Sequence, residues 1–256
     1  MGYFYFDESI HPRGGFILGA YVYSDECLEA QVALTLERFG LRTGIDEFKS
    51  SARADANPRQ HLLRNSLRRL IDRLGLVVAP IADRRLLGRD ALLGLKKIIE
   101  ANRFRESTHE AHFDQGVFES QGQAERWADE VGLPTSVRIF ATDDSKRVGG
   151  IQVADLAAHT MATMLLERLG LVTKTVKAGP NSGYGPDLDI EIGFELWTTL
   201  RYHFFMRSQA ADPDGESYNP NYDVSSCGLF VSPRCEAALA AAPEDRFGIA
   251  YLGCIH

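Results

Sequence analysis

The chain has 256 residues, of which 45% are hydrophobic and 25% are charged, as in a globular protein with a sizeable core. Its formal net charge of −7 argues against a protein that binds nucleic acid through overall charge alone. The sequence has no apolar run long enough to span a bilayer, no secretory signal and no cysteine pair at zinc-site spacing. We therefore expect a cytoplasmic protein with no membrane span.

The charge is unevenly distributed along the chain. The segment 59–105 contains 12 Lys/Arg and 4 Asp/Glu residues, a local charge of +8, which leaves −15 for the remainder. A basic segment beside an acidic centre suits an enzyme that uses metal ions to cut nucleic acid. A solvated helix face is the alternative explanation, and the sequence does not decide between them.

The predicted elements alternate between strands and helices after an opening hairpin. Strands are expected at 3–8, 16–23, 76–81, 110–113 and 137–141, and helices at 26–39, 58–74, 86–105, 121–131 and 150–169. Gly14 and Gly15 are expected to form the hairpin turn. This order predicts a mixed α/β sheet flanked by helices.

Beyond residue 170 the sequence becomes rich in turns and loops. We expect one helix near 191–206, and the alternating acids of 187–192 indicate a half-buried strand or a helix lead-in with a solvated acidic face. The predicted organisation is a domain at 1–170, with a basic helical insertion at 58–106, followed by a loop-rich C-terminal extension at 171–256.

Carboxylates follow two of the predicted strands. Asp7 and Glu8 end the first strand, and because neighbouring strand residues face opposite ways, Asp7 shares a face with Tyr5 whereas Glu8 shares one with Phe6. Asp114 ends a later strand. Either position could also be an ordinary polar strand terminus.

A third acid lies inside an apolar helix. Asp155 is flanked by alanines, and burying it is costly unless it is paired or bound to a metal. Helical spacing places Gln152 and His159 on the same face. His159 is either a ligand or a hydrogen-bonded histidine of the partial core. Glu47, in a loop before Lys49, is either a fourth site carboxylate or a solvated side chain.

The order of these segments resembles the domain of unknown function 3800 family. The resemblance spans about residues 3–168 and is carried by four stretches: Tyr5-Phe6-Asp7-Glu8-Ser9, Glu47-Phe48-Lys49, Phe113-Asp114, and Asp144-Ser145-Lys146 leading to Gly150-Ile151-Gln152-Val153-Ala154-Asp155-Leu156. One departure is Ile10, where the family usually has glycine. We therefore expect the turn to fall later, at Gly14 and Gly15.

The resemblance implies a ribonuclease-H-like fold and a nuclease that uses Mg²⁺ or Mn²⁺. Two such ions activate water and stabilise the leaving oxygen, and they prefer oxygen ligands. The implied residues follow by role. The catalytic and metal-binding carboxylates are Asp7, Glu47, Asp114 and Asp155; the substrate contacts are Lys49, Lys146, Gln152, Arg64 and Arg68; further candidates are Glu8, Asp144 and His159.

Two other functions remain open at this stage. The chain could be a non-catalytic nucleic-acid-binding or assembly subunit with the same fold. A different phosphoryl-transfer enzyme, such as an ATPase, is less well supported, because the sequence has no glycine-rich Walker loop with Lys and Ser/Thr. Whether the nucleic acid is RNA or DNA, and the oligomeric state, do not follow from the sequence.

Overall fold

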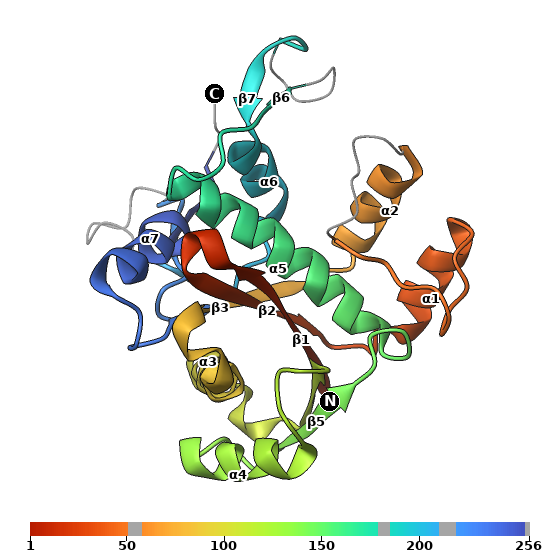
Figure 1. The fold of residues 1–256 in the computed structure, drawn as a ribbon, viewed down its shortest axis with the longest axis vertical. Helices are drawn as coiled ribbons and strands as arrows, with labels where there is room; N and C mark the ends of the chain where they lie inside the picture. Colours follow the sequence, from red (N-terminus) through yellow and green to blue (C-terminus); the bar gives the residue numbers. More distant parts are fainter. Residues whose placement is uncertain (51–57, 179–184, 210–218, 254–256) are drawn as a thin grey trace.

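A mixed β-sheet forms the centre of the protein (Figure 1). The computed structural model describes residues 1–50, 58–178, 185–209 and 219–253. The strands of this sheet are β1 (Gly2–His11), β2 (Phe16–Ser24), β3 (Arg73–Pro80), β4 (His109–Asp114), β5 (Val137–Asp143) and β10 (Leu229–Val231). They stand side by side in the order β10-β3-β2-β1-β4-β5.

Strand β2 runs against the other strands of the sheet. It pairs antiparallel with both β1 and β3, whereas β4 is parallel to β1 and to β5, and β10 is parallel to β3. The predicted hairpin is confirmed, and its turn is the 3-10 segment η1 (Pro12–Gly14) followed by Gly15 at φ 70°. Glycine suits that left-handed conformation because it has no Cβ.

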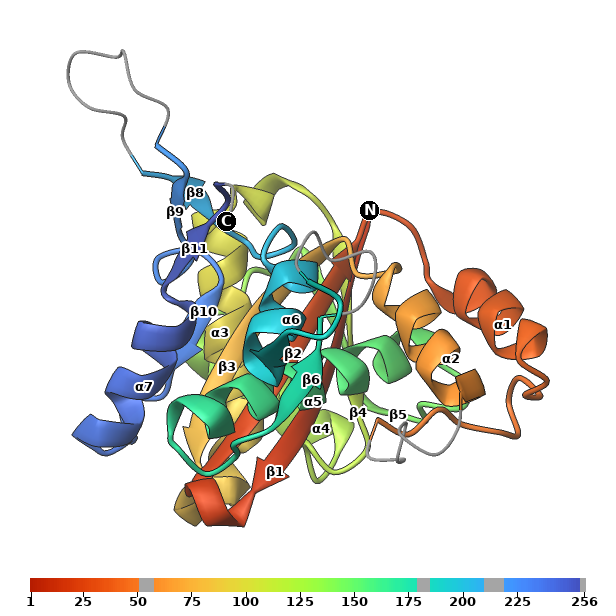
Figure 2. The ribbon, with the colours of Figure 1, turned by 90° about the horizontal axis from the view of Figure 1, so that it is seen from above.

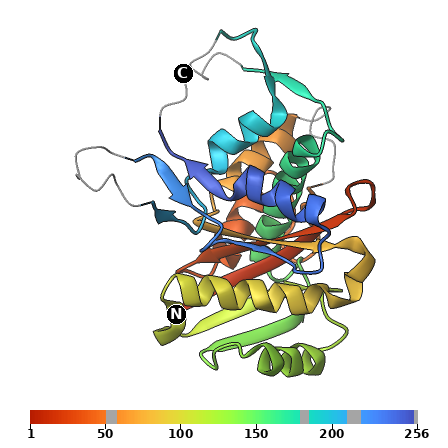
Figure 3. The same cartoon turned by 90° about the vertical axis from the view of Figure 1, so that its left-hand side faces the viewer.

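Helices cover both faces of the sheet (Figures 2 and 3). They are α1 (Glu29–Arg38), α2 (Pro58–Arg68), α3 (Leu87–Ala101), α4 (Gln121–Val131), α5 (Gly149–Arg168), α6 (Ile192–Leu200) and α7 (Ala237–Phe247). The apolar core on one face contains side chains of α3 and α4, and the core on the other contains side chains of α1, α2, α5, α6 and α7. None of the described helices is long and apolar enough to cross a membrane.

Short segments complete the structure. The 3-10 helices η2 (Ile81–Leu86) and η3 (Phe104–Glu106) flank α3. A hairpin is formed by β6 (Thr175–Lys177) and β7 (Asp189–Glu191), and a small sheet by β8 (Arg207–Ser208), β9 (Asn221–Asp223) and β11 (Ile249–Tyr251). The segment after residue 170 therefore supplies one strand of the central sheet and part of its core, as well as loops.

The mixed α/β prediction is confirmed, with corrections to element ends. The predicted helix 58–74 was too long, because α2 ends at Arg68 and residues from Arg73 onward pair with β2. Apolar residues at Leu70, Ile71 and Leu74 continue the helical spacing into the next strand, which hid the boundary. The strand order and directions agree with the mixed sheet that the sequence predicts.

Candidate acidic active site

Asp7 and Asp114 lie where the pairing of β1 with β4 ends. The last paired residues are Phe6 and Phe113, so each aspartate is the next residue along its strand. Because β1 and β4 are parallel, both acids lie at the same end of the pairing between these two strands. Strand β1 itself continues to His11, with Asp7 opposite Ala20 of β2, so the prediction that the first strand ends at Glu8 was wrong. Tyr5 lies in the α5-side core and Phe6 in the opposite one, so strand alternation directs Asp7 toward α5 and Glu8 toward α3.

Helix α5 packs on the face of β1 and β2 and carries Asp155. Its first turn lies very close to β1, since a Cβ built on Gly150 would be 2.4 Å from the ring of Tyr5. Only glycine allows so close an approach here. Gly150 thus allows the helix that carries Asp155 to pack closely on β1, while Gly149 makes the same close approach to Val32 of α1.

Ser50 holds Asp155 through two hydrogen bonds. Its backbone N–H donates to one carboxylate oxygen at 2.9 Å, and its hydroxyl donates to the other at 2.7 Å. Arg64 of α2 donates to the carbonyl of Ser50 and thereby supports this loop. The carboxylate of Asp155 is therefore fixed in orientation by the segment that also carries Glu47.

Gln152 connects two loops to α5 and is almost fully buried. Its side-chain oxygen accepts a hydrogen bond from the N–H of Phe48 at 2.8 Å, and its nitrogen donates to the carbonyl of Ser145 at 2.7 Å. Ser145 in turn donates to Glu47. Both ends of the Gln152 amide bind backbone, so this side chain positions the Glu47 and Ser145 loops.

The acids of β1 influence one another electrostatically. Burial raises the pKa of Asp7 to about 9, and the charges of Glu8, Asp114 and Asp155 add to that increase. Burial also raises the pKa of Glu8 to about 7, with a further increase from Asp114 that Arg84 opposes. Buried like charges disfavour ionisation of each other, which is a frequent property of active sites.

Asp114 belongs to the same set. Burial raises its pKa; Lys49 opposes this increase, while Glu47 and Asp155 add to it. Lys49 forms a 2.6 Å ion pair with Glu47. Burial lowers the pKa of Lys49, but the hydrogen bond and charge of Glu47, with help from the aspartates, outweigh this effect and raise it. The structure thus gathers Asp7, Asp114 and Asp155 with the Glu47–Lys49 pair.

The other predicted residues lie around this set. Burial lowers the pKa of His159, and the nearby charge of Asp155 opposes that shift. Asp144 caps the turn before α5 by accepting a hydrogen bond from the N–H of Lys146, whose side chain is exposed. Arg68 lies half-buried on α2, one turn beyond Arg64.

The donor chemistry of the acids fits a hard divalent cation. They offer carboxylate oxygens, and Oε2 of Glu8 is buried without a hydrogen-bond partner among the described residues. Within those residues, however, no three His, Cys, Asp or Glu side chains are arranged as a metal-binding group. Asp155 and Glu47 are instead bound by Ser50, Lys49 and Ser145.

Sequence reasoning missed Arg84 and the roles of Ser50 and Ser145. Arg84 lies in η2, directly after β3, and its charge acts on Glu8. The signal was available, because Arg84 and Arg85 form a basic pair shortly after the predicted strand 76–81. Its closeness to Glu8 nevertheless depends on the strand order, which periodicity does not reveal.

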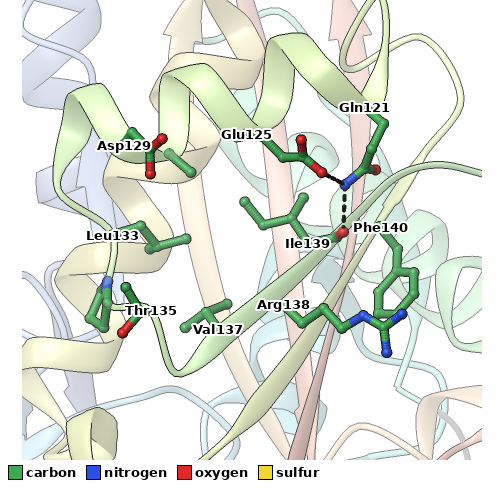
Figure 4. A pocket seen from close by; sticks show the side chains of 11 residues that line it. Gln121, Glu125, Asp129, Leu133, Thr135, Val137, Arg138, Ile139 and Phe140 are labelled. Carbon is green, nitrogen blue, oxygen red and sulfur yellow. Dashed lines mark hydrogen bonds between the residues drawn. The ribbon is translucent and has the colours of Figure 1, made fainter.

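A separate hollow of about 580 Å³ lies between α4 and β5 (Figure 4). In it, Gln121 donates to the carbonyl of Ile139 at 2.8 Å and accepts from the N–H of Ala141 at 2.9 Å. The amide side chain thus makes the two bonds that a neighbouring strand would make at this edge. None of the predicted site acids lines the hollow, which places it apart from the acidic site.

No family model matches the chain, and no curated protein matches it significantly. The comparison with solved structures finds two ribonucleases, both at low TM-scores. Ribonuclease H2 from Pyrococcus horikoshii OT3 has 12% identity and a TM-score of 0.36, over 79% of this chain and 88% of that one. Ribonuclease HII from Archaeoglobus fulgidus, solved in a complex with PCNA, has 15% identity and a TM-score of 0.33, over 78% and 88%. The strand order described above, not these similarities, defines the fold.

Proposed function

We propose that the protein is a metal-dependent nuclease that hydrolyses phosphodiester bonds. The observation that carries this proposal is the convergence of Asp7, Asp114 and Asp155, from β1, β4 and α5, into one electrostatically coupled set. Burial and the charge of Asp155 raise the pKa values of Asp7 and Asp114, so ionising these two acids is unfavourable until a cation neutralises them. Membership of the domain of unknown function 3800 family remains part of the proposal.

Asp7, Asp114 and Asp155 would hold Mg²⁺ or Mn²⁺, and Glu47 would join them on releasing Lys49. The bound ions would supply an activated water and charge stabilisation at the leaving oxygen. Ser50 would keep the Asp155 carboxylate oriented. Lys49, freed from Glu47, and the exposed Lys146 would contact phosphate, while Gln152 would hold the loops that carry them.

A second candidate is a non-catalytic nucleic-acid-binding or assembly subunit with the same fold. The observation in its favour is that the described acids form no metal-binding group and that two of them already have hydrogen-bond partners. Such a protein would bind nucleic acid in a salt-sensitive manner without cutting it.

Cleavage assays distinguish the two candidates. Labelled RNA, single-stranded DNA and duplex DNA are incubated with the protein and Mg²⁺ or Mn²⁺. We expect cleavage that Asp7→Asn and Asp155→Asn reduce at least about 100-fold, whereas Asp129→Asn, which changes an exposed acid of α4, leaves it unchanged. Cleavage by none of the metal and substrate combinations, or equal cleavage by all variants, contradicts the nuclease proposal.

A further inference from the structure

A cleft of about 910 Å³ opens on the α3 side of the acidic site. One wall comes from the segment after β3 and the other from the segment after β4. Asp83, Arg84 and Arg85 line the first wall, and Val117, Phe118 and Glu119 line the second.

The place of the cleft in the sheet favours ligand binding. The chain passes from β1 to β2 and β3 on one side and later returns to β4 and β5 on the other, so the order reverses between β1 and β4. Ligands of open α/β sheets bind beyond the carboxyl ends of strands at such a reversal. The cleft also adjoins the acids, because Val117 donates its N–H to the carbonyl of Asp114 at 3.4 Å.

The charges on the η2 wall of the cleft favour an anion, whereas the other wall carries one exposed acid, Glu119. Arg84 and Arg85 are exposed, and neither guanidinium forms an ion pair or hydrogen bond within the described part of the chain. Asp83, on the same wall, is instead engaged by Arg234 at 3.1 Å, and Arg234 also binds the buried Asp90 at 2.5 Å. Arg234, which follows β10, therefore neutralises Asp83 and links η2 to α3 through Asp90.

We propose that this cleft receives the phosphate backbone of the nucleic-acid strand that runs into the acidic site, with Arg84 and Arg85 contacting its phosphates. This inference rests on the proposed function and deepens it. Arginine contacts phosphate through several N–H donors, and such contacts position a strand without reading its sequence.

Binding without divalent metal tests the cleft separately from catalysis. The double variant Arg84→Gln/Arg85→Gln is compared with Arg89→Gln/Arg126→Gln, which removes the same charge from exposed residues of α3 and α4 outside the cleft. The affinity for labelled RNA and DNA oligonucleotides is measured in EDTA at several salt concentrations. We expect the first variant to bind at least about 10-fold more weakly and to lower the salt slope by about 1.4 to 1.8, since two phosphate contacts are lost.

Catalytic measurements separate failure of the cleft from failure of the nuclease. If both double variants bind with the wild-type affinity and salt slope, the cleft is not the strand path, although cleavage that depends on Asp7 would still support the nuclease. If only Arg84→Gln/Arg85→Gln loses binding while the wild type cuts nothing, the strand-binding proposal is supported and the nuclease proposal is wrong. With an active enzyme, the cleft predicts a raised KM in this variant and a kcat close to that of the wild type.

Discussion

At the scale of single residues, the most informative property is the cost of ionising Asp7 and Glu8. Their pKa values of about 9 and about 7 lie above the ordinary values of 3.8 and 4.5. Between about pH 4 and about pH 9 these two groups bind more protons in the folded protein than in the unfolded chain, so their contribution to stability falls as the pH rises. The stability that the protonated Asp7 and Glu8 contribute is fully present below their ordinary pKa values. It is lost as the pH rises through their raised pKa values.

We therefore expect the melting temperature of the metal-free protein to fall from pH 5 to pH 9, and Asp7→Asn to lessen that fall by at least about 3 °C. The asparagine cannot ionise, so this variant does not lose stability through ionisation of a buried carboxyl group at position 7. Thermal melts in EDTA across the pH range measure it, with Asp129→Asn as the exposed control. Parallel curves for all three proteins would show that Asp7 ionises as easily in the folded protein as in the unfolded chain.

Ser50 gives a second prediction at this scale. Ser50→Ala removes the hydroxyl hydrogen bond to Asp155 but keeps the backbone one. Because partners of metal-binding side chains typically affect metal affinity by 10 to 100-fold, we expect Mn²⁺ binding to weaken by about 10-fold. Calorimetric titration measures this, with the exposed Ser107→Ala as the control. Unchanged Mn²⁺ affinity in Ser50→Ala would mean that Asp155 needs no support from Ser50.

At the scale of elements, the contact of α5 with β1 decides where Asp155 lies. A Cβ on Gly150 would meet the Tyr5 ring, whereas one on Gly122 of the exposed α4 would meet only the far end of Arg126 at 3.8 Å. We expect Gly150→Ala to destabilise the protein by about 1–3 kcal/mol and Gly122→Ala to have little or a stabilising effect. Urea unfolding of the pair measures both, and equal stabilities would show that α5 can move away from β1 freely.

The elements also show what the sequence can and cannot reveal. Strands β1, β2, β4 and β5 were predicted because their composition, alternation and end residues are local signals. Strand β10 was not, since its three residues lie among turns and are fixed by parallel pairing with residues 76–78. The site acids Asp7, Asp114 and Asp155 could be proposed from their positions in the sequence. The electrostatic effect of Arg84 on Glu8 depends on the strand order, which is seen only in the folded structure.

At the scale of the whole molecule, the sequence placed a boundary at residue 170, whereas the packing makes the two parts depend on each other. Leu200, Phe204, Leu229 and Phe247 are fully buried, and they belong to the same core as α5 and β2. Strand β10 also covers the β3 edge of the central sheet, which would otherwise expose unpaired backbone groups.

We accordingly expect a fragment of residues 1–170 to lack a cooperative fold. Removing the C-terminal segment exposes the apolar surface that α6, α7 and β10 cover, and each large buried side chain contributes about 1.5–3 kcal/mol, against a total stability of about 5–15 kcal/mol. Circular dichroism melts and binding of a hydrophobic dye, compared with the full chain, measure this. A sharp thermal transition and Mn²⁺ binding by the fragment alone would instead establish 1–170 as an independent domain, with residues 171–256 as an attachment to it.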